Sequence, residues 1–166
     1  MITTRRQMIR GCGAISVAVA LAGCPNDEPE PEPEPDPEPE PDDPEQRVDS
    51  YLTENDANLY DGTIADHTGE DEVVVAVGAG DDGLAFDPPA ARIDVGTTVV
   101  WEWTGRGGRH NVKSEAEIGS DYEFTSGDPI GEEGHIWDYT FEDSGVSLYY
   151  CEVHRAIGHH GALIVE

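Results

Sequence analysis

The chain has 166 residues, of which 36 are acidic and 9 are lysine or arginine, so its formal net charge is −27. A chain this acidic cannot neutralise phosphate groups over a broad face, which excludes nucleic-acid binding through a basic patch. Its length fits one typical domain behind a leader rather than a multidomain enzyme, and it holds no run of about 20 apolar residues that would predict a mature membrane-spanning helix.

Residues 1–23 have the features of an export signal. They contain no acidic residue, they carry Arg5, Arg6 and Arg10, and an apolar stretch runs from residue 14 to residue 22. A basic start followed by a short apolar run is typical of a signal peptide. The paired arginines resemble a twin-arginine signal, which exports folded proteins. An ordinary secretory signal that happens to hold two arginines is the alternative.

The apolar stretch ends in Leu-Ala-Gly-Cys, residues 21–24, which resembles a lipobox. In such signals the cysteine is lipidated and becomes the new N-terminus. Cys24 is therefore the predicted lipidation site, and two acyl chains would hold the protein firmly on a membrane. The alternative is a free N-terminal region.

Residues 24–45 form a predicted linker. From residue 25 to residue 45 the chain contains nine prolines and eleven acidic residues. Proline removes backbone donors and the carboxylates repel one another, so this segment cannot build a core. We expect a disordered acidic spacer, which in polyproline II form would reach on the order of 65 Å at about 3.1 Å per residue.

Residues 46–166 form the predicted domain, and its pattern is mostly that of strands. The segment 48–55 is its one helical candidate. Val99, Trp101 and Trp103 alternate and should share one face of a strand. Short strand-like runs between turn signals predict an all-β fold, an antiparallel Greek-key sandwich or barrel. These runs lie at 73–77, 91–95, 98–103, 136–141, 147–151 and 162–165.

Cys151 is the one cysteine that remains once the leader and Cys24 are set aside. An unpaired thiol in an exported domain is a liability unless it is buried or metal-bound. Cys151 precedes a histidine-rich turn, with His154 three residues later, and His110 follows a glycine-rich turn. A thiolate with two imidazoles suits copper or zinc, and with a weak axial ligand it is the blue copper arrangement. A buried structural thiol beside surface histidines is the alternative.

The domain resembles the halocyanins, small archaeal blue copper proteins of the cupredoxin fold that are related to plastocyanin. The resemblance covers about residues 48–166. It implies that His110 and His154 are imidazole ligands of one copper ion and that Cys151 is its thiolate ligand. It also implies that Asn111 steadies the cysteine loop. The segments that carry the resemblance are 60–64, 86–89, 96–105, 107–112 and 149–154, and the last two are the most specific.

One position departs from that family. Eight residues after the cysteine, where methionine usually provides the axial ligand, this chain has His159, and no methionine follows Met8. Our hypothesis is that His159 is the fourth ligand and gives a perturbed type 1 site with a lower reduction potential. A solvent-facing His159 is the alternative, and His160 is the alternate ligand, since a one-residue slip would exchange the two. Zinc accepts the same four donors.

The resemblance implies a lipid-anchored electron carrier, not an enzyme, at the outer face of an archaeal cell membrane. Its copper would cycle between Cu(I) and Cu(II), its partners would be redox proteins of a membrane electron-transfer chain, and it would act as a monomer. The acidic surface suits high salt and partners with positive patches. The rival is a copper- or zinc-binding or delivery module without electron transfer, which the missing methionine keeps open. A scaffolding sandwich with a vestigial site is the third possibility.

Overall fold

A computed structural model describes residues 43–166 of the protein. The predicted leader, the lipidation site Cys24 and most of the predicted linker lie outside the described residues. No helix within residues 43–166 is long and apolar enough to cross a membrane. The elements are α1 (Pro44–Glu54), β1 (Ala65–Asp66), β2 (Glu72–Ala79), β3 (Ala85–Asp87), β4 (Ala90–Ile93), β5 (Thr98–Trp103), β6 (Lys113–Ser114), η1 (Ala116–Ile118), β7 (Ile136–Thr140), β8 (Gly145–Tyr150), η2 (Arg155–Ile157) and β9 (His160–Val165).

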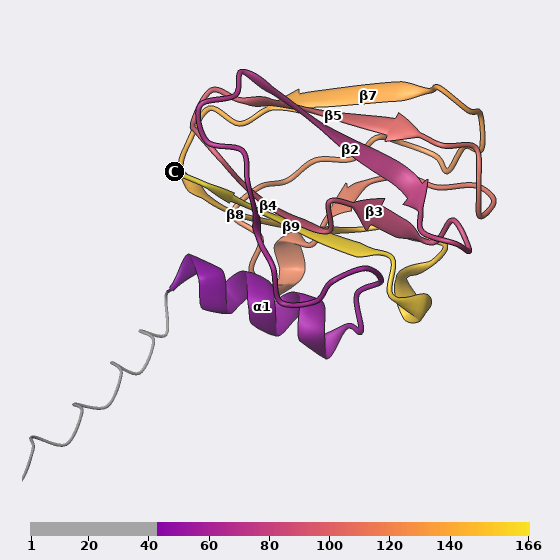
Figure 1. The fold of residues 1–166 in the computed structure, drawn as a ribbon, viewed down its shortest axis with the longest axis horizontal. Coiled ribbons are helices and arrows are strands. Elements are labelled where there is room, and N and C mark those ends of the chain that lie inside the picture. The colour runs from indigo at the N-terminus through magenta and orange to yellow at the C-terminus, as the bar shows by residue number, and fades with distance from the viewer. Residues whose placement is uncertain (1–42) are drawn as a thin grey trace, which may run out of the picture. The chain divides into compact units, whose positions relative to one another are not determined.

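The strands form two sheets that face each other (Figure 1). One sheet has the order β1-β4-β9-β8-β6 and the other has the order β3-β2-β5-β7. The all-β sandwich is confirmed, but its sheets are mixed rather than wholly antiparallel, because β1 with β4, β4 with β9, and β2 with β5 pair in parallel. The reason is topological. The chain leaves the second sheet after β3, forms β4 in the first sheet, and returns in β5 along the same direction as β2.

The main core lies between the two sheets. The predicted shared face of β5 is confirmed, and it points into this core, since Val99 and Trp101 are 0% exposed and Trp103 is 1% exposed. The Trp101 ring packs against Trp137 and Tyr149, with ring centroids 5.1 and 5.6 Å apart. Burial of these large apolar surfaces is the main driving force for folding, and it gives the sandwich the rigidity that a buried site needs.

Helix α1 covers the outer face of the first sheet and makes a second, smaller core there (Figure 1). Its buried residues, Val48, Tyr51 and Leu52, join a cluster with side chains of β8 and β9. The helix begins earlier than the predicted 48–55, so the last two residues of the predicted linker, Pro44 and Glu45, belong to it. The side chain of Asp43 caps the helix by accepting from the Glu45 N–H, and proline is well suited to a first helical turn.

Candidate metal centre

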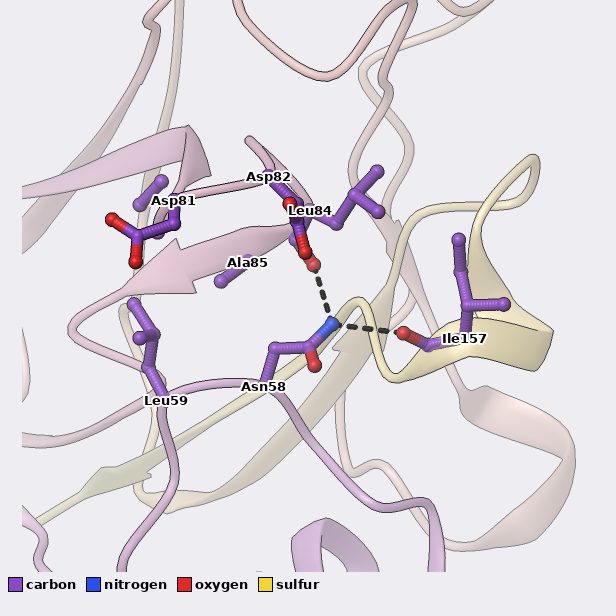
Figure 2. A pocket seen from close by; sticks show the side chains of 9 residues that line it. Asn58, Leu59, Asp81, Asp82, Leu84, Ala85 and Ile157 are labelled. Carbon is purple, nitrogen blue, oxygen red and sulfur yellow. Dashed lines mark hydrogen bonds between the residues drawn. The ribbon is translucent and has the colours of Figure 1, made fainter.

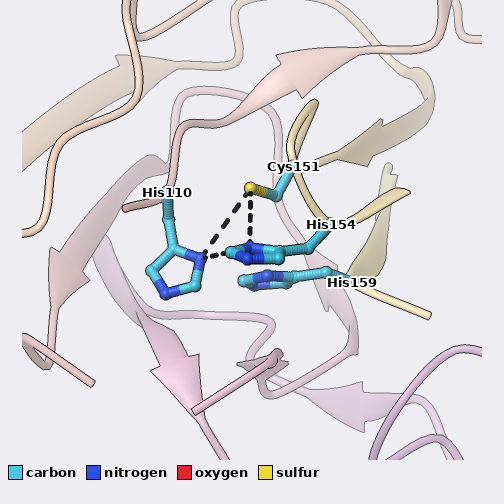
Figure 3. Close-up of side chains that lie close together, drawn as sticks. All are labelled: His110, Cys151, His154 and His159. Carbon is cyan, nitrogen blue, oxygen red and sulfur yellow. Dashed lines mark hydrogen bonds between the residues drawn. The ribbon is translucent and has the colours of Figure 1, made fainter. Parts of the chain in front are cut away.

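Four side chains converge between the end of β8 and the loop after β5. The donor atoms of His110, Cys151, His154 and His159 all lie within 4.8 Å of one another (Figure 3). The Cys151 Sγ atom is 3.8 Å from Nδ1 of His110 and 3.7 Å from Nδ1 of His154, and the two Nδ1 atoms are 3.1 Å apart. His154 is partly exposed, whereas the other three are fully buried.

These separations fit one small metal ion. Nitrogen donors about 2.0 Å and a sulfur about 2.3 Å from a shared ion lie about 3.5 Å (N to N) and about 3.8 Å (N to S) apart in a trigonal arrangement. The three observed edges, 3.1, 3.7 and 3.8 Å, are close to these values. The structure therefore places the predicted thiolate and two imidazole ligands at the separations that a trigonal metal site needs.

His110 is held by its backbone and by its second ring nitrogen. Its N–H and C=O pair with those of Ile130, at 2.7 and 2.9 Å. The Nε2 atom is 2.7 Å from the Arg106 carbonyl oxygen, which is an acceptor, so Nε2 carries the proton and Nδ1 presents its lone pair to Cys151. Gly78 leaves room for this contact, because a Cβ there would lie 2.7 Å from the Arg106 oxygen.

Cys151 and its neighbours form a tight loop between β8 and β9. The Cys151 N–H donates to the His159 carbonyl at 3.0 Å, and the His154 N–H donates to the Cys151 carbonyl at 3.1 Å. Burial raises the pKa of the Cys151 thiol, although nearby backbone N–H groups oppose the rise. Since a bound cation deprotonates a coordinating thiol, metal binding is expected to release a proton here.

Asn111 links the loop that carries His110 to the loop that carries Cys151 and His154. Its Oδ1 accepts from the backbone N–H of Glu152 at 2.9 Å, and its Nδ2 donates to the Glu152 carboxylate at 2.7 Å and to the Gly127 carbonyl at 3.0 Å. Glu152 also pairs with Lys113 at 2.8 Å. The residue after His110 is thus bonded to the residue after Cys151, which is the contact that the resemblance implied for Asn111.

His159 is buried without the hydrogen bonds that buried imidazoles normally make. Neither ring nitrogen has a hydrogen-bond partner among the described residues, and the side chain is 0% exposed. Its ring lies against Phe86, with centroids 4.3 Å apart, and nearly parallel to His154 at 6.0 Å. A solvent-facing His159 is thus ruled out. Burying a polar group without a partner costs free energy. A metal ion bound by the neutral ring would satisfy one of the two nitrogens and so account for their lack of hydrogen bonds.

His160, the alternate ligand, lies on the other side of its strand. Its Nδ1 is 2.8 Å from the Tyr51 hydroxyl and its Nε2 is 2.8 Å from the Arg155 carbonyl oxygen. Successive side chains of an extended segment point to opposite faces, so His159 turns into the sandwich and His160 turns toward helix α1. The alternate assignment is corrected on this ground: both nitrogens of His160 are already engaged elsewhere.

The metal-free protein should lose stability as the pH falls from 7 to 5. Burial, and then the nearby His110, His154 and His160, lower the pKa of His159 from 6.5 to about 2. The folded state keeps this ring neutral while the unfolded chain binds a proton, so its contribution is complete above pH 6.5 and declines as the pH falls toward the folded pKa. At pH 5 the loss from His159 alone is about 2 kcal/mol. Denaturant unfolding of the wild type and of His159→Met at a series of pH values measures it, and parallel profiles for the two proteins would contradict it.

The chain is similar to known copper-binding proteins. A family model described as copper-binding proteins of the plastocyanin/azurin family matches residues 73–166. The chain is 61% identical over 163 residues to the halocyanin of Natronomonas pharaonis, covering 98% of each chain. It is 30% identical over 99 residues to the plastocyanin of Scenedesmus fuscus, covering 57% of this chain and 100% of that one. A purple cupredoxin from Nitrosopumilus maritimus aligns with a TM-score of 0.46 and 27% identity over 57% of this chain and 99% of that chain. The four-residue group is suited to one copper ion.

Proposed function

The chain belongs to the plastocyanin/azurin family of copper-binding proteins, and from that premise we propose that it is a blue copper electron carrier. Its ligands would be His110, Cys151 and His154. The observation that carries the proposal is the convergence of a buried sulfur and two Nδ1 atoms within 3.8 Å. Bound copper would supply a one-electron couple between Cu(II) and Cu(I).

The surrounding residues hold these side chains in one arrangement. The Arg106 carbonyl fixes the tautomer of His110, and Asn111 bonds to the residue beside Cys151. Ligands that are fixed before the electron arrives need little rearrangement when the charge of the site changes. His154 is the one partly exposed member of the group, so its ring edge is the natural place for a redox partner to approach.

His159 would complete the set as a fourth ligand. Its buried ring has no hydrogen-bond partner among the described residues, and its nitrogen lies within 4.8 Å of the other three donor atoms. Imidazole is a stronger and harder donor than the thioether of methionine, so it should stabilise Cu(II) relative to Cu(I). The proposed site is therefore a perturbed type 1 centre with a lowered reduction potential.

The proposed location is the outer face of an archaeal cell membrane, with the protein anchored as a monomer through a lipid on Cys24. This rests on the leader and the lipobox-like residues 21–24. The proline- and acid-rich linker would let the domain move between a donor and an acceptor of a membrane electron-transfer chain. The acidic surface would favour partners with positive patches, although high salt would screen that attraction.

A second candidate function is copper or zinc binding or delivery without electron transfer. The observation that favours it is His159, because one thiolate and three imidazoles form a donor set that zinc also accepts. The two candidates differ in whether the bound metal changes its oxidation state reversibly.

The deciding experiment is the addition of Cu(II) to the protein in high salt, followed by visible and EPR spectroscopy. We expect an intense thiolate-to-copper band in the red region that a reductant bleaches and an oxidant restores, with one copper bound per chain. Zinc(II) titrated in parallel gives the comparison. Absence of the band together with tighter binding of zinc would reject the electron carrier and favour the second candidate.

A further inference from the structure

We propose that the segment of residues 44–60, which precedes the part of the chain matched by the family model, is a positioning element for the metal-binding loop. It comprises helix α1 and the turn after it, and it lies outside the matched residues 73–166. The inference is that this segment holds residues 155–160 and thereby keeps His159 turned inward. It rests on the function proposed above. It gives a role to residues that are neither metal ligands nor in contact with the metal.

Asn58 connects the segment both to the loop before His159 and to the residue that precedes β3. Its backbone N–H donates to the Gly158 carbonyl at 2.8 Å. Its side-chain Nδ2 donates to the Ile157 carbonyl at 2.8 Å and to the Leu84 carbonyl at 2.9 Å (Figure 2). Leu84 stands two residues before Phe86, whose ring packs on His159. One asparagine therefore links the ligand loop to the strand that bears the aromatic wall of the site.

The loop and the segment also approach each other closely at Gly158. This glycine has a φ of +82°, a backbone conformation that residues other than glycine rarely adopt. A Cβ at Gly158 would collide with the carbonyl oxygen of Asp56, and it would lie 3.2 Å from the side-chain amide of Asn58. The position directly before His159 therefore requires glycine, because a larger residue would not fit against the segment.

Tyr51 makes a second connection, from the buried face of α1. Its hydroxyl lies 2.8 Å from Nδ1 of His160 and 3.1 Å from the Tyr149 carbonyl oxygen. The other nitrogen of His160 contacts the Arg155 carbonyl at 2.8 Å, and Arg155 immediately follows His154. Since the carbonyl oxygen accepts a hydrogen bond from Nε2–H, Nδ1 of the neutral ring is an acceptor, and the Tyr51 hydroxyl donates to it. His160 is therefore a bridge between the helix and the loop rather than a ligand.

The test compares Asn58→Ala and Tyr51→Phe with two matched controls from the same segment. Asn55→Ala removes a side-chain bond from Nδ2 to the Tyr51 carbonyl, and Tyr60→Phe removes a hydroxyl bonded to Asp49, and neither of these bonds touches the loop. Hydrogen exchange of the loop amides in the metal-free protein measures how firmly the loop is held. Competition with a chelator and the EPR hyperfine splitting measure the effect on the copper site.

For Asn58→Ala we expect about tenfold faster exchange of the loop amides and about tenfold weaker Cu(II) binding with an altered hyperfine splitting. Tyr51→Phe should act in the same direction with a smaller effect, and the two controls should match the wild type. If both variants behave like their controls in exchange and in the spectrum, the inference is overturned. Faster exchange with an unchanged spectrum and affinity would also overturn it, because the segment would then stabilise the loop without positioning a ligand.

Failure of this inference can be distinguished from failure of the proposed function. If the wild-type protein itself shows no thiolate-to-copper band, the electron carrier is rejected. The exchange rates of the metal-free variants and their zinc(II) affinities then decide the inference: values equal to those of the controls, or faster exchange with unchanged zinc affinity, overturn it, and faster exchange with weaker zinc binding supports it.

Discussion

Replacing Cys151 with serine should abolish the red-region band of the copper-loaded protein completely. The band requires a thiolate bonded to copper, and Cys151 is the one described cysteine. A serine hydroxyl is a hard donor that remains protonated, so the two imidazoles lose their soft partner. The fold should survive, because the buried hydroxyl is similar in size to the thiol and can bond to Nδ1 of His110 or His154, which now lie 3.8 and 3.7 Å from the sulfur. Visible spectroscopy and thermal unfolding of the metal-free protein measure both effects.

Cys24→Ser is the matched control for this substitution. The same chemical change is made at a cysteine outside the described residues, so the band should keep its full intensity. If Cys24 carries the lipid, this variant should also leave the membrane fraction and appear in the soluble fraction. An undiminished band in Cys151→Ser would contradict the assignment of the thiolate ligand. A membrane-bound Cys24→Ser protein would contradict the anchor and leave the copper site unaffected.

Replacing His159 with methionine should raise the reduction potential. The imidazole favours Cu(II), and each tenfold loss of that preference raises the potential by about 59 mV for a one-electron couple. Methionine is unbranched and adaptable, so it should fit the space beside Phe86 without forcing the sandwich apart. Voltammetry gives the potential, and EPR shows whether the copper hyperfine splitting changes with it.

The same variant has a readout that needs no metal. Because His159 is buried with a pKa of about 2, its removal should flatten the loss of stability between pH 7 and pH 5. His67→Met is the control, since His67 pairs with Glu70 in an outlying loop and takes no part in the group. An unchanged potential and spectrum in His159→Met would show that His159 does not coordinate, whatever the pH profile does.

The two substitutions together separate the candidate functions. A reversible band that disappears in Cys151→Ser and a potential that rises in His159→Met describe an electron carrier tuned by its fourth ligand. Zinc binding that is strong in the wild type and weak in His159→Met, with no reversible copper couple, describes a metal-binding or delivery module. The buried ring of His159 is central to both, because it is the fourth donor of the group and has no hydrogen-bond partner among the described residues.

Sequence by itself determined the features that depend on local properties of the chain. Alternation placed Val99, Trp101 and Trp103 on one face, because successive side chains of a strand point to opposite sides, and the structure shows that this face is buried. The softness of one thiolate and two imidazoles indicated the class of metal before any geometry was known. Family-specific segments around His110 and Cys151 then indicated the copper site, because donors of that type at that spacing are rarely found together by chance.

Only the tertiary structure decided between His159 and His160. Both follow the same loop, and their order along the chain cannot say which one faces the sandwich; the pairing of β9 with β8 decides it, with Tyr150 opposite His160. Strands β1, β3 and β6 were missed because two or three residues are too few for a periodic pattern. The parallel pairing of β2 with β5 was missed because it depends on a crossover between sheets. The contacts of Asn58 and Tyr51 with the ligand loop likewise join residues about 100 positions apart, and only packing brings such residues together.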